Sequence, residues 1–228
     1  MRYESRLEAG HVLAGQLREL ELGSCVVAAI PRGGIVVAVP IAEQLSAPLV
    51  ALSARKLCTP DAPDCPFGAI DEDGHAVLDY RAMVTLGLSA SDVAPIKICA
   101  TEEMARRLAA SGGPRLCDCA PGRTVVLVDD GLVTSLTMQA AIACARRHGA
   151  TATVVAVPCA SDRASFEVGG LLSGAHDRLI CPRGGPCVLS ENEYYSELPE
   201  LSDEDVARIL ERAGARCPVF DYSHSRLF

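Results

Sequence analysis

Uninterrupted apolar runs alternate with amphipathic segments along most of the chain. Short β-branched runs without polar interruption are typical of strands buried on both faces of a parallel sheet, whereas apolar positions at helical spacing predict helices. The predicted strands are 25–30, 48–57, 124–130, 151–160 and 178–183. The predicted helices are 3–20, 35–45, 91–111, 134–150, 161–172 and 201–214, the last capped at Ser202. This alternation predicts an α/β fold, a mainly parallel twisted sheet flanked by helices.

The pattern changes between residues 58 and 80. The segment CTPDAPDCPFG (58–68) has three prolines, two aspartates and a glycine, and therefore predicts an irregular loop. The segment AIDEDGHAVLDY (69–80) predicts a hairpin that turns at Asp73-Gly74. We interpret about 58–80 as a small flexible hood on a single domain spanning 1–228, with a C-terminal hood part and helix at about 183–228. Residues 112–123 predict a linker.

Charge and composition exclude several classes of protein. The net charge of −8 argues against nonspecific binding to nucleic acid or to an anionic membrane. The N-terminal segment is charged, and no run approaches the about 18 apolar residues of a membrane span, so we expect a cytoplasmic protein. The 11 cysteines include no CxxC pair, which predicts reduced thiols rather than a disulfide framework or a structural zinc site.

The segment VVLVDDGLVTSLT (125–137) carries the candidate chemistry. Adjacent carboxylates at Asp129 and Asp130 gain nothing from a core, and they lie at a predicted strand end, where open α/β sheets bind ligands. Hydroxyls at Thr134, Ser135 and Thr137 open the next helix, whose unpaired N–H groups suit a phosphate. Carboxylate oxygens suit Mg²⁺ or sugar hydroxyls. Together these features indicate a phosphorylated sugar as ligand.

Simpler interpretations of the same segment exist. The hydroxyls could be ordinary helix caps. The acids could end a Walker-B strand or include a phosphoacceptor, as in receiver domains, although a receiver would place its acid pair near the N-terminus. The chain contains no GxxxxGK[ST] and no Gly-Lys pair, which excludes a P-loop ATPase.

The same segment resembles the signature of type I phosphoribosyltransferases that binds 5-phosphoribosyl 1-diphosphate (PRPP). That signature has four apolar residues, two acids, three spacers and Thr-Gly-x-Thr. Further segments resemble a bacterial branch of the family: IPRGGIVVA (30–38), RKLCTPDAPDCPFGAI (55–70) and YYSELPELSDEDV (194–206). The resemblance implies the type I phosphoribosyltransferase fold, with a hood that closes around residues 60–66 to exclude water.

The resemblance also implies roles for individual residues. The acid pair would hold the ribose hydroxyls, directly or through Mg²⁺, the loop 133–137 would cradle the 5′-phosphate, and the turn 31–34 would meet the pyrophosphate. The catalytic candidates are Arg32, Lys56, Asp129 and Asp130, the last two also as Mg²⁺ ligands. The further PRPP-binding candidates are Gly33, Gly34, Arg55, Gly131, Val133, Thr134, Ser135, Leu136 and Thr137. The candidates to line the acceptor site are Pro158, Cys159, Tyr194 and Tyr195.

Two positions depart from the family pattern. Ser135 stands where the signature has Gly, and Asn192 stands in ENEYY where Gly is expected. If residue 135 needs a positive φ, Ser is strained there by about 1 kcal/mol or more; alternatively, its hydroxyl donates to the phosphate.

The expected function is Mg²⁺-dependent transfer of ribose 5-phosphate from PRPP to a nitrogenous, nucleobase-like acceptor, with release of pyrophosphate. The alternative is a non-catalytic protein of the same fold that binds PRPP or a nucleotide as a regulator. The expected partners are PRPP and a small-molecule acceptor, and a homodimer is a further expectation.

Overall fold

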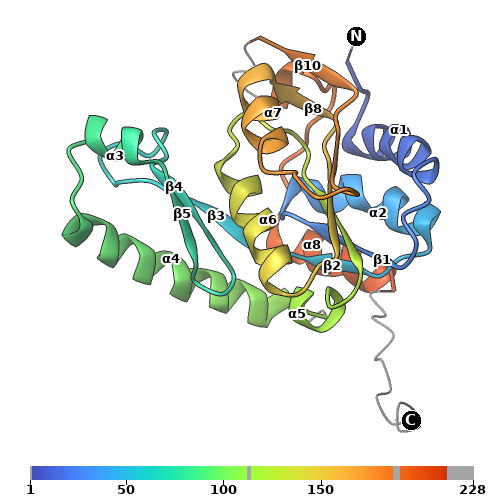
Figure 1. The fold of residues 1–228 in the computed structure, drawn as a ribbon, viewed down its shortest axis with the longest axis horizontal. Coiled ribbons are helices and arrows are strands. Elements are labelled where there is room, and N and C mark those ends of the chain that lie inside the picture. The colour runs from blue at the N-terminus through green and yellow to red at the C-terminus, as the bar shows by residue number, and fades with distance from the viewer. Residues whose placement is uncertain (1, 112–113, 187–190, 215–228) are drawn as a thin grey trace, which may run out of the picture.

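The computed structural model describes residues 2–111, 114–186 and 191–214, and a five-stranded parallel sheet forms its centre (Figure 1). The strand order is β2-β1-β6-β7-β9. The strands are β1 (Cys25–Ala29), β2 (Leu49–Ala51), β6 (Thr124–Val128), β7 (Ala152–Ala156) and β9 (Arg178–Ile180). The register pairs Ala29 with Val128, so the segments that follow β1 and β6 emerge side by side. The predicted α/β class is confirmed.

Helices cover both faces of this sheet, which explains why its strands are apolar throughout. Val27 and Val126 face a core shared with one helical layer, whereas Val26 and Val125 face the opposite core. The first layer contains α1 (Arg6–Arg18), α2 (Gly33–Leu45) and α8 (Asp203–Arg212). The second contains α5 (Leu116–Cys119), α6 (Leu136–Arg147) and α7 (Asp162–Gly169). Ser202 caps α8, as predicted, through a capping box with Asp205.

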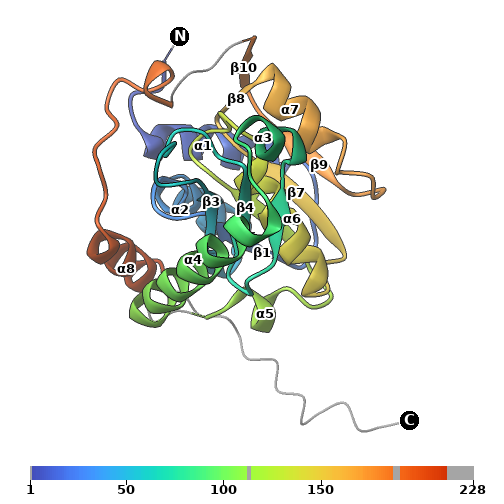
Figure 2. The same ribbon diagram turned by 90° about the vertical axis from the view of Figure 1, so that its left-hand side faces the viewer.

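Residues 54–111 form the hood, which projects to one side of the sheet (Figures 1 and 2). Its elements are the antiparallel strands β3 (Ala54–Leu57), β4 (Gly68–Asp71) and β5 (Ala76–Leu78), and the helices α3 (Tyr80–Thr85) and α4 (Ala90–Ser111). The predicted hairpin is confirmed, with Gly74 at φ +81° in its turn. The folded hood includes α3 and α4 and is larger than the predicted 58–80. The predicted C-terminal hood part, about 183–228, lies partly outside the described residues.

Several predicted element bounds are wrong, for identifiable reasons. The predicted strand 48–57 is two strands, because the chain passes from the sheet to the hood at Ser53, whose N–H donates to the Glu72 carboxylate (3.2 Å). The predicted strand 151–160 ends before Pro158, which has no N–H, and continues as β8 (Cys159–Ser161) paired with β10 (Arg183–Gly185). The predicted helix 134–150 begins at Leu136. The predicted linker 112–123 contains α5.

Most of the described cysteines are free thiols. They are Cys25, Cys58, Cys65, Cys99, Cys117, Cys144, Cys159 and Cys181. Cys119 is disulfide-bonded, so the expectation of reduced thiols is wrong there. Within the described ranges, no helix combines the length and apolarity that a membrane crossing requires.

Candidate active site

The turn 31–34 and the acid pair meet at the carboxyl end of the sheet. Ile30 N–H donates to the Val128 carbonyl (2.8 Å), and the Pro31–Arg32 peptide bond is cis. A Cβ on Gly33 would lie 1.8 Å from Asp130 Oδ2, and one on Gly34 would lie 2.9 Å from the Val128 carbonyl oxygen. The two glycines therefore let the turn pack directly against the acid pair, a contact that the sequence interpretation had placed with the phosphates instead.

Arg6 on α1 is a site residue that the sequence interpretation missed. Its Nε pairs with Asp130 Oδ2 (2.7 Å), and its Nη1 donates to the Pro199 carbonyl (2.7 Å). The two paired side chains are only 12% and 15% exposed, so the ion pair is little screened by solvent. Nothing local in the sequence distinguishes Arg6, because its partner lies more than a hundred residues away.

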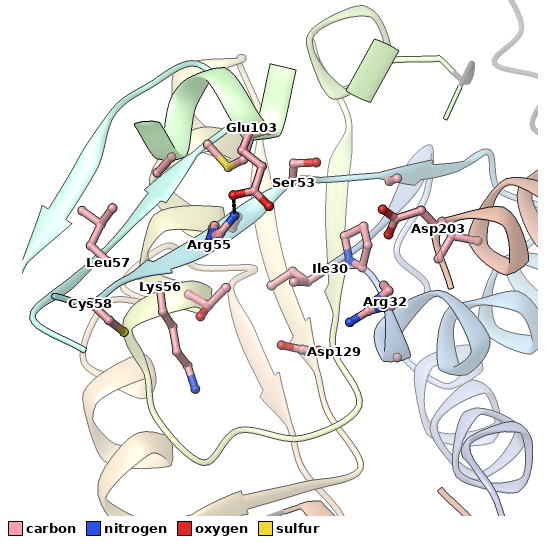
Figure 3. Close-up of a pocket in the computed structure, with 18 of the residues that line it drawn as sticks. Ile30, Arg32, Ser53, Arg55, Lys56, Leu57, Cys58, Glu103, Asp129 and Asp203 are labelled. Carbon is pink, nitrogen blue, oxygen red and sulfur yellow. Dashed lines mark ion pairs between the residues drawn. The ribbon is translucent and has the colours of Figure 1, made fainter. Parts of the chain in front are cut away.

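A cavity of about 1180 Å³ opens above the acid pair, between the sheet, the hood and α8 (Figure 3). Residues 31–33 of the turn and the acid pair form its floor, and residues 51 and 53–58 form one wall; Gly34 lies outside the lining. The hood adds Pro60, Pro63 and one face of α4, including Ile96 and Met104. The first turns of α8 close the remaining side with Asp203, Glu204, Val206 and Ala207, none of which the sequence interpretation had selected.

The three predicted cations line this cavity in different settings. Arg32 donates through Nη1 to the Leu201 carbonyl (2.6 Å), just before α8. Arg55 forms an ion pair with Glu103 of α4, whereas Lys56 points away from Arg55 (Figure 3). Adjacent strand residues point to opposite faces, which accounts for this divergence. In the part of the chain that the structure describes, Lys56 makes no ion pair.

The predicted phosphate loop separates two cavities. Of residues 133–137, only Thr137 lines the large cavity; the other four line a second cavity of about 610 Å³ between the hood and α7. Helix α6 starts without a side-chain cap, so its first N–H groups are available to a ligand. The buried Thr134 hydroxyl has no hydrogen-bond partner within the described residues. These donors suit an anion at the start of α6.

Ser135 is unstrained but already engaged. Its φ of −82° lies in the ordinary helical region, so the structure does not require Gly at this position. Its hydroxyl donates to the Glu167 carboxylate and accepts from Gln139 Nε2 (2.7 Å). Arg163 also pairs with Glu167 (2.8 Å). The hydrogen bond from Ser135 is the main cause that lowers the pKa of Glu167. The negatively charged carboxylate of Glu167 therefore already lies beside this loop.

The four predicted acceptor-site residues lie outside both cavities. Tyr195 is 3% exposed and donates its hydroxyl to the Asp130 carbonyl (2.7 Å), and burial raises the pKa of that hydroxyl. Cys159 is buried, and Pro158 accepts a hydrogen bond from Tyr3 (3.2 Å). Tyr194 packs beside this cluster. The hydrogen bond from Tyr195 therefore helps to hold the backbone of Asp130 in place. Asn192 lies in the short 3-10 helix Glu191–Glu193, away from the cavity linings.

Comparison with known proteins agrees with this geometry. The phosphoribosyl transferase domain model matches residues 4–168. The chain belongs to the phosphoribosyl transferase family. The matched range contains the turn 31–34, the hood and the acid pair, whereas α8, which closes the cavity, lies beyond it.

Individual relatives are similar to this phosphoribosyl transferase family member along most of its chain. Two Mycobacterium tuberculosis proteins, "Putative phosphoribosyl transferase MT0597" of strain CDC 1551 and Rv0571c of strain H37Rv, are each 35% identical over 92% of the chain. The chain spans about half the length (47%) of these curated relatives. The crystal structure of TT1426 from Thermus thermophilus is 32% identical, with a TM-score of 0.76 over 93% of this chain and 99% of that one.

The acid pair fits the Mg²⁺ that many phosphoribosyl transferase family members use. Both carboxylates line the cavity floor, and Mg²⁺ is commonly held by one or two carboxylates together with substrate phosphates. Asp129 Oδ1 accepts the N–H of Asp130 (2.9 Å), which orients that carboxylate. Arg6 already pairs with Asp130, so a cation at the acid pair would share that carboxylate with Arg6.

Proposed function

We propose that this domain transfers ribose 5-phosphate from PRPP to a nitrogenous acceptor in a Mg²⁺-dependent reaction that releases pyrophosphate. The observation that supports the proposal most is the meeting of three segments at one cavity floor. Residues 31–33 of the turn, the acid pair and Thr137 at the start of α6 line the same cavity, in a chain of the phosphoribosyl transferase family. PRPP carries the three groups that such segments would recognise: a pyrophosphate, a diol and a 5′-phosphate.

The arrangement suggests how the residues share the work. Breaking the bond from C1 to pyrophosphate develops negative charge on the leaving group and positive charge on the ribose. Arg32 and Lys56 would neutralise the leaving group from two sides, while Asp129 and Asp130 would orient the ribose through its hydroxyls. Mg²⁺, when bound at the acid pair, would supply further positive charge toward the pyrophosphate. Fixed local cations matter in a chain whose net charge is −8.

The walls of the cavity suggest a flat, partly apolar acceptor that carries N–H groups. Ile96 and Met104 of α4 face the cavity from one side, and Val206 of α8 faces it from the other. Glu103 and Asp203 add carboxylate oxygens to the same space, and these accept rather than donate hydrogen bonds (Figure 3). A nucleobase-like heterocycle with amino or ring N–H groups has this chemistry.

Phosphorus NMR tests the proposed function directly. The protein is incubated with PRPP and Mg²⁺ and, in separate samples, with purines, pyrimidines and pyridines. We expect pyrophosphate to appear together with a new phosphomonoester signal when the right acceptor is present. Pyrophosphate that never exceeds the level of a protein-free control with any acceptor would contradict the proposal.

A regulatory protein that binds PRPP without turnover is the second candidate, and one observation favours it. Glu167 occupies the side of the loop where a 5′-phosphate would bind, through its hydrogen bond from Ser135. PRPP binding with no pyrophosphate release under any acceptor would select this candidate over the enzyme.

The hood loop gives a further prediction. The segment 58–68 runs from the end of β3 to the first residue of β4, and Pro60 and Pro63 line the cavity, so bound ligand would contact this loop. We expect PRPP with Mg²⁺ to slow proteolytic cleavage within 58–68 several-fold, because ligand contacts oppose local opening. Mass spectrometry of the fragments measures the rate, and cleavage near 171–176, outside both cavities, serves as the control. Equal rates at 58–68 with and without ligand would show that the loop does not close.

A further inference from the structure

A second cluster of polar residues joins the hood to the core, away from both cavities. The turn between β4 and β5 meets the C-terminal end of α6. There, one oxygen, Asp73 Oδ2, is approached by His148 Nε2 (2.7 Å), Arg147 Nη2 (2.8 Å) and Cys144 Sγ (3.7 Å). None of these residues lines the cavities described above.

The cluster is partly buried and rich in carboxylates. Asp71 and Cys144 are buried, and the Glu72 side chain is 1% exposed. Glu72 Oε1 lacks a hydrogen-bond partner within the described residues, since the Arg115 guanidinium stands off at 3.5 Å. Burying such an oxygen without a close donor is costly unless a cation lies nearby.

The cluster contains more carboxylates than arginines. The turn brings three consecutive acids, Asp71, Glu72 and Asp73, against two arginines, Arg115 and Arg147. With all three carboxylates ionised, the cluster carries one negative charge more than its two arginines offset, and a bound cation would balance that charge. The neighbouring Cys144 thiol can serve as a ligand for a metal ion.

We propose that Asp73, Cys144 and His148 bind a Zn²⁺ ion. Their three ligand atoms lie within 4.8 Å of one another, as ligands of one ion must. Cys144 and His148 are four residues apart, one on α6 and one at its C-cap, so they project on the same side of the helix. Sulfur, imidazole nitrogen and carboxylate oxygen are the ligands that Zn²⁺ takes in proteins. His148 is 19% exposed, which leaves room for water at a fourth position.

Ion binding leaves the surrounding charges satisfied. Arg147 also pairs with Asp71 (2.8 Å), so it keeps a partner when Zn²⁺ takes over Asp73. The thiol of Cys144 gives its proton to solvent, as does His148 if it is protonated. Zn²⁺ is then bound by one thiolate, one carboxylate and one neutral imidazole, so the ion and its three ligands together carry no net charge. Burial and the adjacent acids raise the pKa of the Cys144 thiol, a cost that a directly bound cation offsets.

The consequence of this site is a metal link between two parts of the molecule. Asp73 belongs to the hood hairpin, whereas Cys144 and His148 belong to the helix that begins at the phosphate loop. Zn²⁺ at this point would fix the hairpin to α6 and so hold the hood over the cavity. The ion would stabilise the fold without taking part in chemistry at the acid pair.

Cobalt(II) spectroscopy on the full chain, stripped of metal and kept reduced, tests the site. We expect one Co²⁺ per chain to produce a near-ultraviolet thiolate charge-transfer band and visible bands of tetrahedral intensity, both removed by Zn²⁺. Cys144→Ser should abolish the charge-transfer band. His148→Gln should weaken binding by more than the about 10- to 100-fold that loss of an outer-shell partner costs. The matched control Cys25→Ser, in the buried strand β1, should leave the spectrum unchanged.

Stability measurements keep the test decisive if Cys144→Ser folds poorly. Zn²⁺ should raise the unfolding temperature of the wild type but not of His148→Gln, whose substituted side chain lies near the surface. No charge-transfer band in the wild type, or a band of equal strength and affinity in His148→Gln, would overturn the proposal. PRPP is absent from every sample, so the result is independent of the proposed function.

Discussion

Asp129→Asn should abolish the stabilisation of this protein by PRPP and Mg²⁺ while leaving the unliganded fold intact. Asp129 lies at the end of β6 on the cavity floor, outside the core. An amide oxygen can still accept the Asp130 N–H, so we expect the free energy of unfolding to change by no more than about 0.5 kcal/mol. The loss of charge removes the anionic ligand for the cation and weakens the hydrogen bond that residue 129 would accept from a ribose hydroxyl. We expect affinity to fall by about 100-fold or more, which removes most of the stabilisation of about 2.7 kcal/mol that ligand gives the wild type at 100 times its dissociation constant.

Thermal unfolding with and without PRPP and Mg²⁺ measures this effect. Asp118→Asn is the matched control, because Asp118 lies on α5, before β6, and lines neither cavity. The control should keep the full ligand-dependent shift in unfolding temperature. A shift of wild-type size in Asp129→Asn would remove the ribose and Mg²⁺ assignment from the acid pair.

Asp130 is a less direct probe, because its carboxylate has a structural partner. Asp130→Asn would leave the little-exposed Arg6 guanidinium without its ion pair, which costs about 1–3 kcal/mol. If Asp130→Asn alone lost the ligand-dependent shift in unfolding temperature, weaker ligand binding could not be separated from a less stable fold. Arg6→Met combined with Asp130→Asn removes both charges, and comparison of the single and double variants isolates the coupling between them.

The sequence predicts the fold well where one element lies in one environment. The strands at 25–30 and 124–130 were recognised because burial on both faces makes them apolar at every position. The prediction for 48–57 was wrong because Leu52 packs in the main core and Leu57 packs in the hood core. Both environments select apolar residues, so the sequence pattern does not mark the boundary between them.

The candidate site was predictable where its residues are neighbours in sequence. The acid pair and the turn 31–34 are local motifs, and each follows a strand whose end could be located. Arg6, Glu103 and Glu167 reach the site from α1, α4 and α7 and belong to no motif. Their contacts depend on how the helices pack around the sheet. Partner residues of this kind, which change the charge of a site, were therefore missed.

Glu167→Gln should tighten PRPP binding, because the wild-type loop already holds an anion. Glu167 accepts a hydrogen bond from the Ser135 hydroxyl at the edge of the predicted 5′-phosphate site, and its lowered pKa keeps it charged at neutral pH. A phosphate bound there experiences repulsion from this carboxylate. The Glu167 side chain is 34% exposed, so solvent screens the effect, and we expect a gain of about 1 kcal/mol, or roughly fivefold in dissociation constant. Isothermal titration with PRPP and Mg²⁺ measures the change.

The Ser135→Gly substitution then decides what the hydroxyl does. In the wild type the hydroxyl is committed to Glu167, so its removal should change PRPP affinity little. In the Glu167→Gln background the neutral amide oxygen competes less strongly for the hydroxyl, which can then donate to phosphate, and its removal should weaken binding by about 1 kcal/mol. Arg163→Gln is the control, because it removes a partner of Glu167 but keeps the carboxylate, and it should not tighten binding. Equal PRPP affinity in all variants would place the 5′-phosphate away from residue 135. A loss of affinity on Ser135→Gly in the wild-type background would instead show that PRPP displaces Glu167 from the hydroxyl when it binds.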